Sequence, residues 1–181
     1  LLSLKDFNLC SRIAELAEAG ITSFKIEGRL KNESYVRNVV RDYSIALDEL
    51  VARCPETYER GSYGQVSGGF TPDTAKTFNR GYTELYLDGR RGRWAAMDAA
   101  KSMGEEIGKV VSLNRDKSQI TLKAHRKGLE LSNGDGFSFV AKDGTVAGFR
   151  GDVCQGDTIR CKSTPSLYVG ATLFRNISAV F

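Results

Sequence analysis

Apolar residues recur at helical spacing in two stretches near the start of the chain. Leu9, Ile13 and Leu16 fall on one stripe, and Gly20 stands where a glycine commonly ends a helix. A longer amphipathic helix is expected over residues 35–51. Its apolar face is formed by Tyr35, Val36, Val39, Val40, Tyr43, Leu47, Leu50 and Val51.

A short segment between the two predicted helices has the alternation of a β-strand. Phe24 and Ile26 form an apolar face, whereas Lys25 and Glu27 form a charged one. A strand followed directly by a helix is typical of βα-repeat folds, in which the carboxyl ends of the strands face the active site. Lys25, Glu27 and Arg29 lie at that end of the predicted strand.

The pattern offers this strand no partner, because no further βα unit follows it. The chain also begins with Leu1 rather than Met. We therefore expect residues 1–53 to be the last part of a larger barrel, whose missing N-terminal portion is a partner of this chain. The alternative is a helix–strand–helix lid on the following domain, with Lys25 and Glu27 as solvated surface residues.

Helical periodicity is lost after residue 53. Thr71 and Pro72 are typical of a helix start, so a short helix is expected up to Lys76. From residue 105 the pattern becomes that of short strands, and turn signals such as Asp143–Gly144 recur at the spacing of a small barrel or sandwich. The expected strands cover 107–113, 120–124, 137–139, 146–149, short segments near 153 and 159, and 168–175.

The predicted fold class is therefore α+β, with three regions. Residues 1–53 are expected to be the helix–strand–helix remnant of a TIM-like barrel. Residues 54–104 are expected to form a Gly- and Arg-rich linker with short helices, and residues 105–181 a small antiparallel β-barrel.

Composition narrows the classes of function. Hydrophobic residues make up 41% of the chain and charged residues 27%, as in ordinary globular proteins. No apolar run approaches the roughly 20 residues of a membrane helix, so no membrane partner is expected. The four cysteines are scattered, which argues against a metal site or a disulfide scaffold and favours the cytoplasm. The net charge of +4 permits an acidic partner such as RNA.

Two sets of residues are candidates for chemistry. Lys25 and Glu27 share one face of the predicted strand, where they could clamp a substrate or act as a general acid and base. Arg29 would add affinity for phosphate or carboxylate groups. A structural ion pair is the alternative for Lys25 and Glu27.

The second set combines cations with aromatic rings, a combination suited to single-stranded RNA. A solvated charged loop is the alternative. The candidate RNA-binding residues are Arg80, Tyr82, Arg90, Arg91, Arg93 and Trp94.

Several blocks together resemble a known family. Leu2–Phe7, Leu16–Ile21 and Ser23–Lys31 follow the order LSxKDL…LxxAGxxSxKIEGRxK. This order resembles the end of the catalytic domain in the collagenase-like peptidase family U-32. Phe78–Tyr82 and Asn133–Phe139 resemble the collagenase-associated extension of longer members. The two resemblances span nearly the whole chain.

The resemblance implies a TIM-like barrel upstream and a small β-barrel downstream. Several members of the family are implicated in hydroxylating RNA bases or quinones with a cysteine-bound iron–sulfur cluster, and extended members resemble the ribosomal-RNA hydroxylation type. Lys25, Glu27 and Arg29 are carried over as residues of the barrel mouth. The cysteines of the cluster would lie mainly in the missing N-terminal region, so no cofactor is expected within these residues.

The leading hypothesis is that the intact protein hydroxylates bases of ribosomal RNA and that this part contributes RNA binding. The first alternative is a collagenase-type protease whose extension binds a protein or peptide substrate. The second is a binding module without chemistry of its own.

Overall fold

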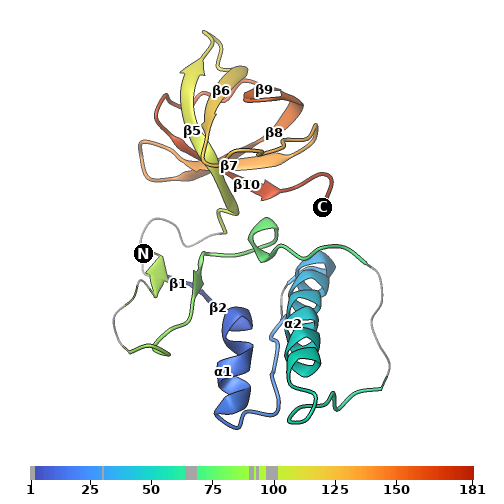
Figure 1. Cartoon of the computed structure of the whole chain (residues 1–181). Coiled ribbons are helices and arrows are strands. Elements are labelled where there is room, and N and C mark those ends of the chain that lie inside the picture. The colour runs from blue at the N-terminus through green and yellow to red at the C-terminus, as the bar shows by residue number, and fades with distance from the viewer. Residues whose placement is uncertain (1–2, 30, 64–68, 90–91, 93, 97–101) are drawn as a thin grey trace.

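The computed structural model describes residues 3–29, 31–63, 69–89, 92, 94–96 and 102–181. A helical part and a β-barrel are stacked on each other (Figure 1). The two parts meet where the ring of Phe181 packs edge-on against Phe70, with ring centroids 5.7 Å apart. The coarse prediction is confirmed, because the chain is α+β and contains a closed antiparallel barrel. The TIM-like origin of the helical part stays a prediction.

Both predicted helices are present. A 3-10 turn, η1 (Cys10–Arg12), leads into α1 (Ile13–Glu18). The chain leaves α1 through Gly20, whose φ of +89° is readily adopted by glycine alone. The long helix α2 (Glu33–Arg53) begins where the side chain of Asn32 accepts a hydrogen bond from the backbone N–H of Tyr35.

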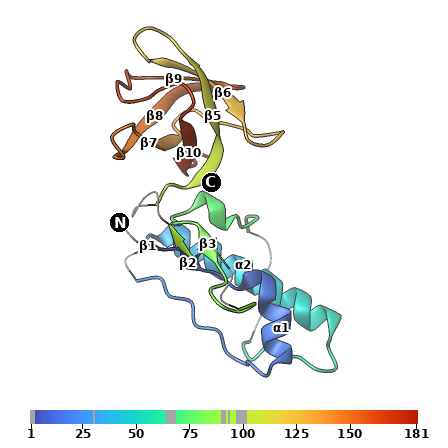
Figure 2. The same cartoon turned by 90° about the vertical axis from the view of Figure 1, so that its left-hand side faces the viewer.

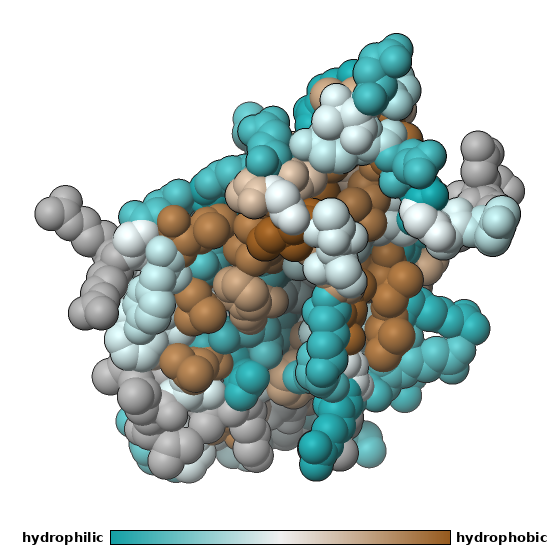
Figure 3. Space-filling view, turned by 90° about the horizontal axis from the view of Figure 1, so that it is seen from below, coloured by the Kyte–Doolittle hydropathy of each residue, from teal (hydrophilic) through white to brown (hydrophobic). Residues whose placement is uncertain are grey.

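The apolar face of α2 is covered only in part. Tyr35, Val39 and Leu50 are buried, whereas Val36 and Val40 are 38% and 46% exposed. Other large apolar side chains of the helical part are exposed as well, among them Leu4, Phe7 and Ile21. Figure 3 shows apolar residues gathered in the middle of the face seen from the helical end.

The predicted strand around residues 22–27 is not formed. The segment has the alternating exposure of a strand, with Phe24 and Ile26 half-buried and Lys25 and Glu27 exposed. However, no described residue forms backbone hydrogen bonds with residues 22–27. A strand exists only when a neighbour satisfies its N–H and C=O groups, so the pattern is correct but the ladder is absent.

Two short ladders connect the N-terminal residues with the middle of the chain. Strand β1 (Ser3–Leu4) pairs antiparallel with β4 (Ala95–Ala96), and β2 (Asp6–Phe7) pairs parallel with β3 (Tyr82–Thr83). The 3-10 helix η2 (Thr74–Lys76) precedes β3 and is capped by Asp73 rather than by Thr71. Figure 2 shows β2 and β3 side by side below the barrel. The boundary predicted after residue 53 is untested, yet these ladders join residues on both sides of it.

The barrel closes in the strand order β10-β5-β6-β9-β8-β7. Its core contains the fully buried side chains Ile107, Ile120, Phe137, Ile159 and Leu173. The strands are Glu105–Leu113 (β5), Gln119–Ala124 (β6), Gly136–Val140 (β7), Val146–Gln155 (β8), Thr158–Cys161 (β9) and Thr172–Ile177 (β10).

The turn signals placed most of these strands correctly. Gly144 has a φ of +81° in the predicted turn between β7 and β8, where the carboxylate of Asp143 accepts the N–H of Thr145. One expectation was wrong: Val146 and Val153 belong to one strand, β8, rather than to two. The register of β8 shifts between Gly151 and Val153, and such an irregularity bends a strand without ending it.

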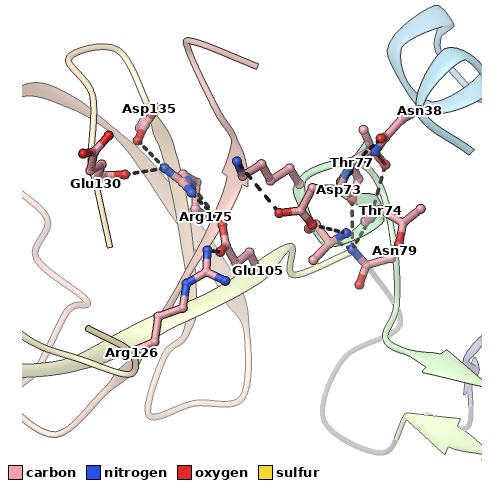
Figure 4. Close-up of polar contacts among 12 residues, drawn as sticks. Asn38, Asp73, Thr74, Thr77, Asn79, Glu105, Arg126, Glu130, Asp135 and Arg175 are labelled. Atoms are coloured by element: carbon pink, nitrogen blue, oxygen red, sulfur yellow. Dashed lines mark hydrogen bonds and ion pairs between the residues drawn. The ribbon is translucent and has the colours of Figure 1, made fainter. Parts of the chain in front are cut away.

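A buried ion network closes one end of the barrel (Figure 4). The guanidinium of Arg175 in β10 donates to Glu105 Oε2 at 2.7 Å, to Asp135 Oδ2 at 3.2 Å and to the carbonyl of Glu130 at 2.9 Å. The side chains of Arg175, Glu105 and Asp135 are 5%, 8% and 0% exposed. Arg126 is exposed and forms an ion pair with the other carboxylate oxygen of Glu105, Oε1. The two arginines together balance the charges of Glu105 and Asp135.

Removing Arg175 should therefore destabilise the barrel strongly. The variant Arg175→Met leaves two buried carboxylates without their main counter-charge, and we expect the free energy of unfolding to fall by about 3–5 kcal/mol. Arg126→Met is the control, because it removes an exposed partner of the same Glu105 and should cost about 1 kcal/mol or less. Urea denaturation monitored by circular dichroism measures both values. Equal losses in the two variants would contradict this role of Arg175.

Candidate functional site

A groove with a volume of about 510 Å³ lies between the N-terminal segment, residues 21–31, one face of α2 and β3. We call it the central groove. It brings together the two sets of predicted residues, since Lys25, Glu27 and Arg29 line it together with Arg80 and Tyr82. Its charged residues are Asp6, Lys25, Glu27, Arg29, Lys31 and Arg80.

Asp6 fixes the position of Arg80 in the central groove. The backbone N–H of Arg80 donates to Asp6 Oδ2, and its guanidinium donates to Asp6 Oδ1, both at 2.8 Å. The Asp6 side chain is 12% exposed, so water competes little for these bonds. The hydrogen bond with Asp6 raises the pKa of Arg80 above its ordinary value, and Arg80 is therefore a permanent cation.

The loop that carries Arg80 is folded around two buried asparagines (Figure 4). The side-chain amide of Asn79 donates to the carbonyls of Thr77 and Ala75 at 2.9 and 3.1 Å. Asn38 of α2 donates to the carbonyl of Asp73 at 2.7 Å and accepts its N–H at 2.9 Å. These bonds satisfy backbone groups in and around η2 and attach this segment to α2.

A second cation is held over aromatic rings. The ammonium of Lys31 lies 3.4 Å from the ring centroid of Phe78 and 5.3 Å from that of Tyr35. Both distances are within the range of a cation–π interaction. Burial lowers the pKa of Lys31, and the nearby charge of Arg80 acts in the same direction. Lys31 and Arg80 therefore make this end of the groove positive.

The three residues predicted to be catalytic lie at the open side of the groove. Lys25 Nζ is 3.7 Å from Glu27 Oε2, and the two side chains are 87% and 68% exposed. The N–H of Arg29 donates to Glu27 Oε1 at 3.2 Å. An exposed ion pair such as Lys25–Glu27 contributes little to the free energy of folding. Stability therefore does not explain why these two residues lie at the groove.

The predicted RNA-binding residues have different surroundings. Tyr82 lines the central groove, its hydroxyl donates to the carbonyl of Thr74 at 2.8 Å and burial raises its pKa; its role in RNA binding stays a prediction. Trp94 packs edge-on against Tyr86, with ring centroids 6.4 Å apart, and its carbonyl accepts the N–H of Lys5. Arg90, Arg91 and Arg93 lie outside the described residues, and their role stays a prediction.

Sequence reasoning missed the residues that build the groove. From the sequence, Asp6 is equally well explained as a residue that reaches the barrel mouth and as a first-turn acid of the first helix; its pairing with Arg80 was not predicted. Asn38 was overlooked, although a polar residue on the buried side of an amphipathic helix is a recognisable signal of an internal hydrogen bond. The side chain of Asn79 binds carbonyls of its own loop, and no pattern in the sequence of that loop predicted these hydrogen bonds.

A second hollow, of about 610 Å³, is acidic and contains Cys10. Burial and, to a smaller extent, the carboxylates of Asp42 and Glu49 raise the pKa of the Cys10 thiol to about 12. Burial likewise raises the pKa of Cys154 and Cys161 to about 11. Metal ligation needs thiolates, and no group of three or more His, Cys, Asp or Glu is placed for it in the described part of the chain. The expectation that the cysteines of an iron–sulfur cluster lie outside these residues stays a prediction.

The fold and the groove define an α+β chain with a cationic groove and an attached small barrel. Residues 1–96 match Peptidase family U32, and the chain belongs to that family. This confirms the family resemblance of the sequence motifs. No solved structure matches the chain. No helix in the described residues is long and apolar enough to cross a membrane.

Relatives that are named for different activities are similar to this chain. The chain is 36% identical to the 23S rRNA 5-hydroxycytidine C2501 synthase of Escherichia coli, over 86% of its own length and 23% of the relative. It is 30% identical to the tRNA hydroxylation protein P1 of Bacillus subtilis, over 67% of its own length and 28% of the relative. A collagenase of Porphyromonas gingivalis is 36% identical over 52% of the chain and 24% of the relative. The chain thus spans about a quarter of the length of these relatives.

The raised pKa of Cys10 predicts an unreactive thiol. At pH 8 the thiolate fraction should be about a thousandfold below that of a thiol with the ordinary pKa of 9.0, so alkylation by iodoacetamide should be slow. Because burial is the main cause, the rate should rise sharply in urea. Mass spectrometry of peptides after timed alkylation measures it. Fast labelling of Cys10 in the folded chain would contradict the burial.

Proposed function

We propose that the chain is the C-terminal part of an RNA base-hydroxylation enzyme of Peptidase family U32, in which it contributes RNA binding. The central groove is the observation that carries this proposal. Four cations, Lys25, Arg29, Lys31 and Arg80, line it against two carboxylates. Phosphate groups of RNA are attracted to such a surface, and the attraction is independent of base sequence.

Aromatic side chains in the same groove support RNA over other anions. Phe7 is 57% exposed, and Phe24 lies half-buried on the same groove. Unpaired bases stack on aromatic rings, whereas a small anion such as phosphate gains nothing from them. The groove therefore offers both kinds of contact that a single-stranded or looped RNA needs.

The extent of the matches also favours RNA. The matches to the two RNA-hydroxylation relatives cover 86% and 67% of the chain, more than the 104 residues that precede the barrel can supply. They therefore reach into the barrel. The collagenase match, over 52% of the chain, is short enough to fit within the helical part.

The relatives' length and the open helical part support a larger protein. Residues 22–27 have the alternation of a strand without a ladder in the described chain, and Val36 and Val40 are exposed on α2. An upstream barrel of the family would provide both the neighbouring strand and the apolar cover. Lys25, Glu27 and Arg29 would then stand at its mouth, where Glu27 is the proposed general acid or base.

The cysteines of this chain bear on the proposed cofactor and on the proposed cellular compartment. An iron–sulfur cluster, if the enzyme uses one, would be held by cysteines outside these residues, since the described residues contain no group of three or more His, Cys, Asp or Glu placed to hold a metal ion. All four cysteines are free. Free, scattered cysteines are typical of the cytoplasm, which is the proposed location.

A collagenase-type protease is the second candidate, because relatives named collagenase share the helical part. Its extension would bind a protein or peptide substrate. The described thiol chemistry disfavours a cysteine nucleophile, since burial raises the pKa of Cys10 instead of lowering it.

RNA binding by the 181-residue chain tests the proposal. Affinity for single-stranded RNA should fall as salt rises, and Lys25→Ala with Arg29→Ala should reduce the slope of log K against log salt by about 1.4, or 0.7 per lost phosphate contact. Arg37→Ala with Arg53→Ala is the control, because it removes the same charge from exposed positions of α2. Fluorescence anisotropy measures the affinities. No binding at 50 mM salt, or equal slopes in both double variants, would refute RNA binding by the groove.

The role of Glu27 requires the complete enzyme. Glu27→Gln should reduce RNA base hydroxylation by about a hundredfold or more while leaving RNA affinity nearly unchanged, because the amide cannot transfer the proton. Mass spectrometry of nucleosides after digestion measures the product. Full hydroxylation by Glu27→Gln would exclude Glu27 from the chemistry. Gelatin cleavage that is lost in Glu27→Gln, without RNA hydroxylation in the wild type, would support the protease instead.

A further inference from the structure

The barrel has a groove of its own, remote from the charged residues of the central groove. It has a volume of about 480 Å³ and lies between β8 and the loop that follows β9. We call it the barrel groove. Its size is within the roughly 300–1,000 Å³ of small-ligand sites. Among the residues that line it are Phe149, Arg150, Asp152, Lys162, Thr164 and Ser166.

The floor of the barrel groove is a fixed aromatic ring. Phe149 is half-buried, and its ring centroid lies 5.3 Å from that of Phe137 and 6.3 Å from that of Phe139. Both neighbours are 1% exposed, so they cannot move aside. A ring held in this way keeps part of its surface open at little cost in side-chain entropy, as a stacking platform for a base requires.

Two cations, Arg150 and Lys162, line the barrel groove together with Phe149. Arg150 and Lys162 are exposed, and neither side chain forms a hydrogen bond or ion pair with any residue of the described chain. Asp152 is the one carboxylate among the residues of the barrel groove, all of which lie in the fully described range 102–181. The barrel groove therefore has a net positive charge that no internal partner neutralises.

The other wall is held in place before any ligand arrives. Thr164 Oγ1 donates to the carbonyl of Lys117 at 2.8 Å, and Lys117 Nζ donates to the carbonyls of Pro165 and Leu167 at 2.5 and 2.7 Å. These bonds attach the loop after β9 to the turn between β5 and β6. Ser166 is exposed on this loop and lines the barrel groove. A preformed wall reduces the entropy lost when a ligand binds.

We infer that the barrel groove binds one nucleotide of single-stranded RNA, with the base on Phe149 and the phosphate between Arg150 and Lys162. This inference rests on the proposed RNA function and adds a second contact to it. An acidic peptide would use the two cations but would leave the aromatic floor unused. The matches to the two RNA-hydroxylation relatives reach into the barrel, which also favours RNA.

Matched variants of the 181-residue chain test this site with a fluorescein-labelled single-stranded oligocytidylate. Lys162→Ala should weaken binding about fivefold at low salt and reduce the slope of log K against log salt by about 0.7. Phe149→Leu should weaken binding roughly fivefold to a hundredfold with an unchanged slope. Lys109→Ala is the control, because Lys109 is exposed on β5, three strands from β8 in either direction around the barrel. This variant should change the affinity and the slope only by the small long-range effect of removing one charge.

Each outcome has a separate meaning. If the chain binds RNA but Lys162→Ala behaves like Lys109→Ala, the barrel groove is wrong and the proposed function stands. If the chain does not bind RNA at low salt, the proposed function and this inference both fail. If a polyglutamate peptide binds and Lys162→Ala weakens it while RNA does not bind, the barrel groove is a peptide site. Thermal melting checks that Phe149→Leu is folded, and Lys162→Ala decides the question if it is not.

Discussion

The helical part depends on one carboxylate that binds two groups of a single distant residue. Asp6 accepts both the backbone N–H and the guanidinium of Arg80, and this fixes the parallel pairing of β2 with β3. On the other side of the same loop, Asn38 holds Asp73 against α2. Residues 73–82 therefore act as a bridge between the N-terminal segment and the long helix. Without it, one wall of the central groove would have no fixed position.

The bridge explains how a mildly basic chain obtains a local concentration of positive charge. Arg80 is oriented by Asp6, and Lys31 lies over the ring of Phe78, which belongs to the bridge. Folding therefore positions these two cations, whereas Lys25 and Arg29 are exposed at the open side. Two oriented cations inside and two exposed cations at the rim suit a polyanion, because each can contact a phosphate of the same backbone.

The sequence predicted those parts whose cause is local. Helix α2 follows from a continuous 3.6-residue period, and the barrel from alternating strands separated by turns such as Asp143–Gly144. The strand at 22–27 failed because a ladder needs a neighbour, which periodicity cannot supply. The role of Asp6 was missed for the same reason, since Arg80 lies 74 residues away in the chain. Lys25 and Glu27 were predicted to lie at a barrel mouth and Arg80 in an RNA-binding loop; that all three line one groove was not predicted, because the loop of Arg80 reaches the groove through long-range contacts.

Hydrogen exchange of the 181-residue chain, with and without single-stranded RNA, is the sharpest test of whether the bridge and residues 21–31 form one RNA-binding groove. RNA should slow exchange in peptides covering residues 21–29 and 78–83, and it should leave the exposed face of α2 around Arg37 and the C-terminal turn of α2 around Arg53 unchanged. RNA that binds without slowing exchange in residues 21–29 and 78–83 would contradict the account.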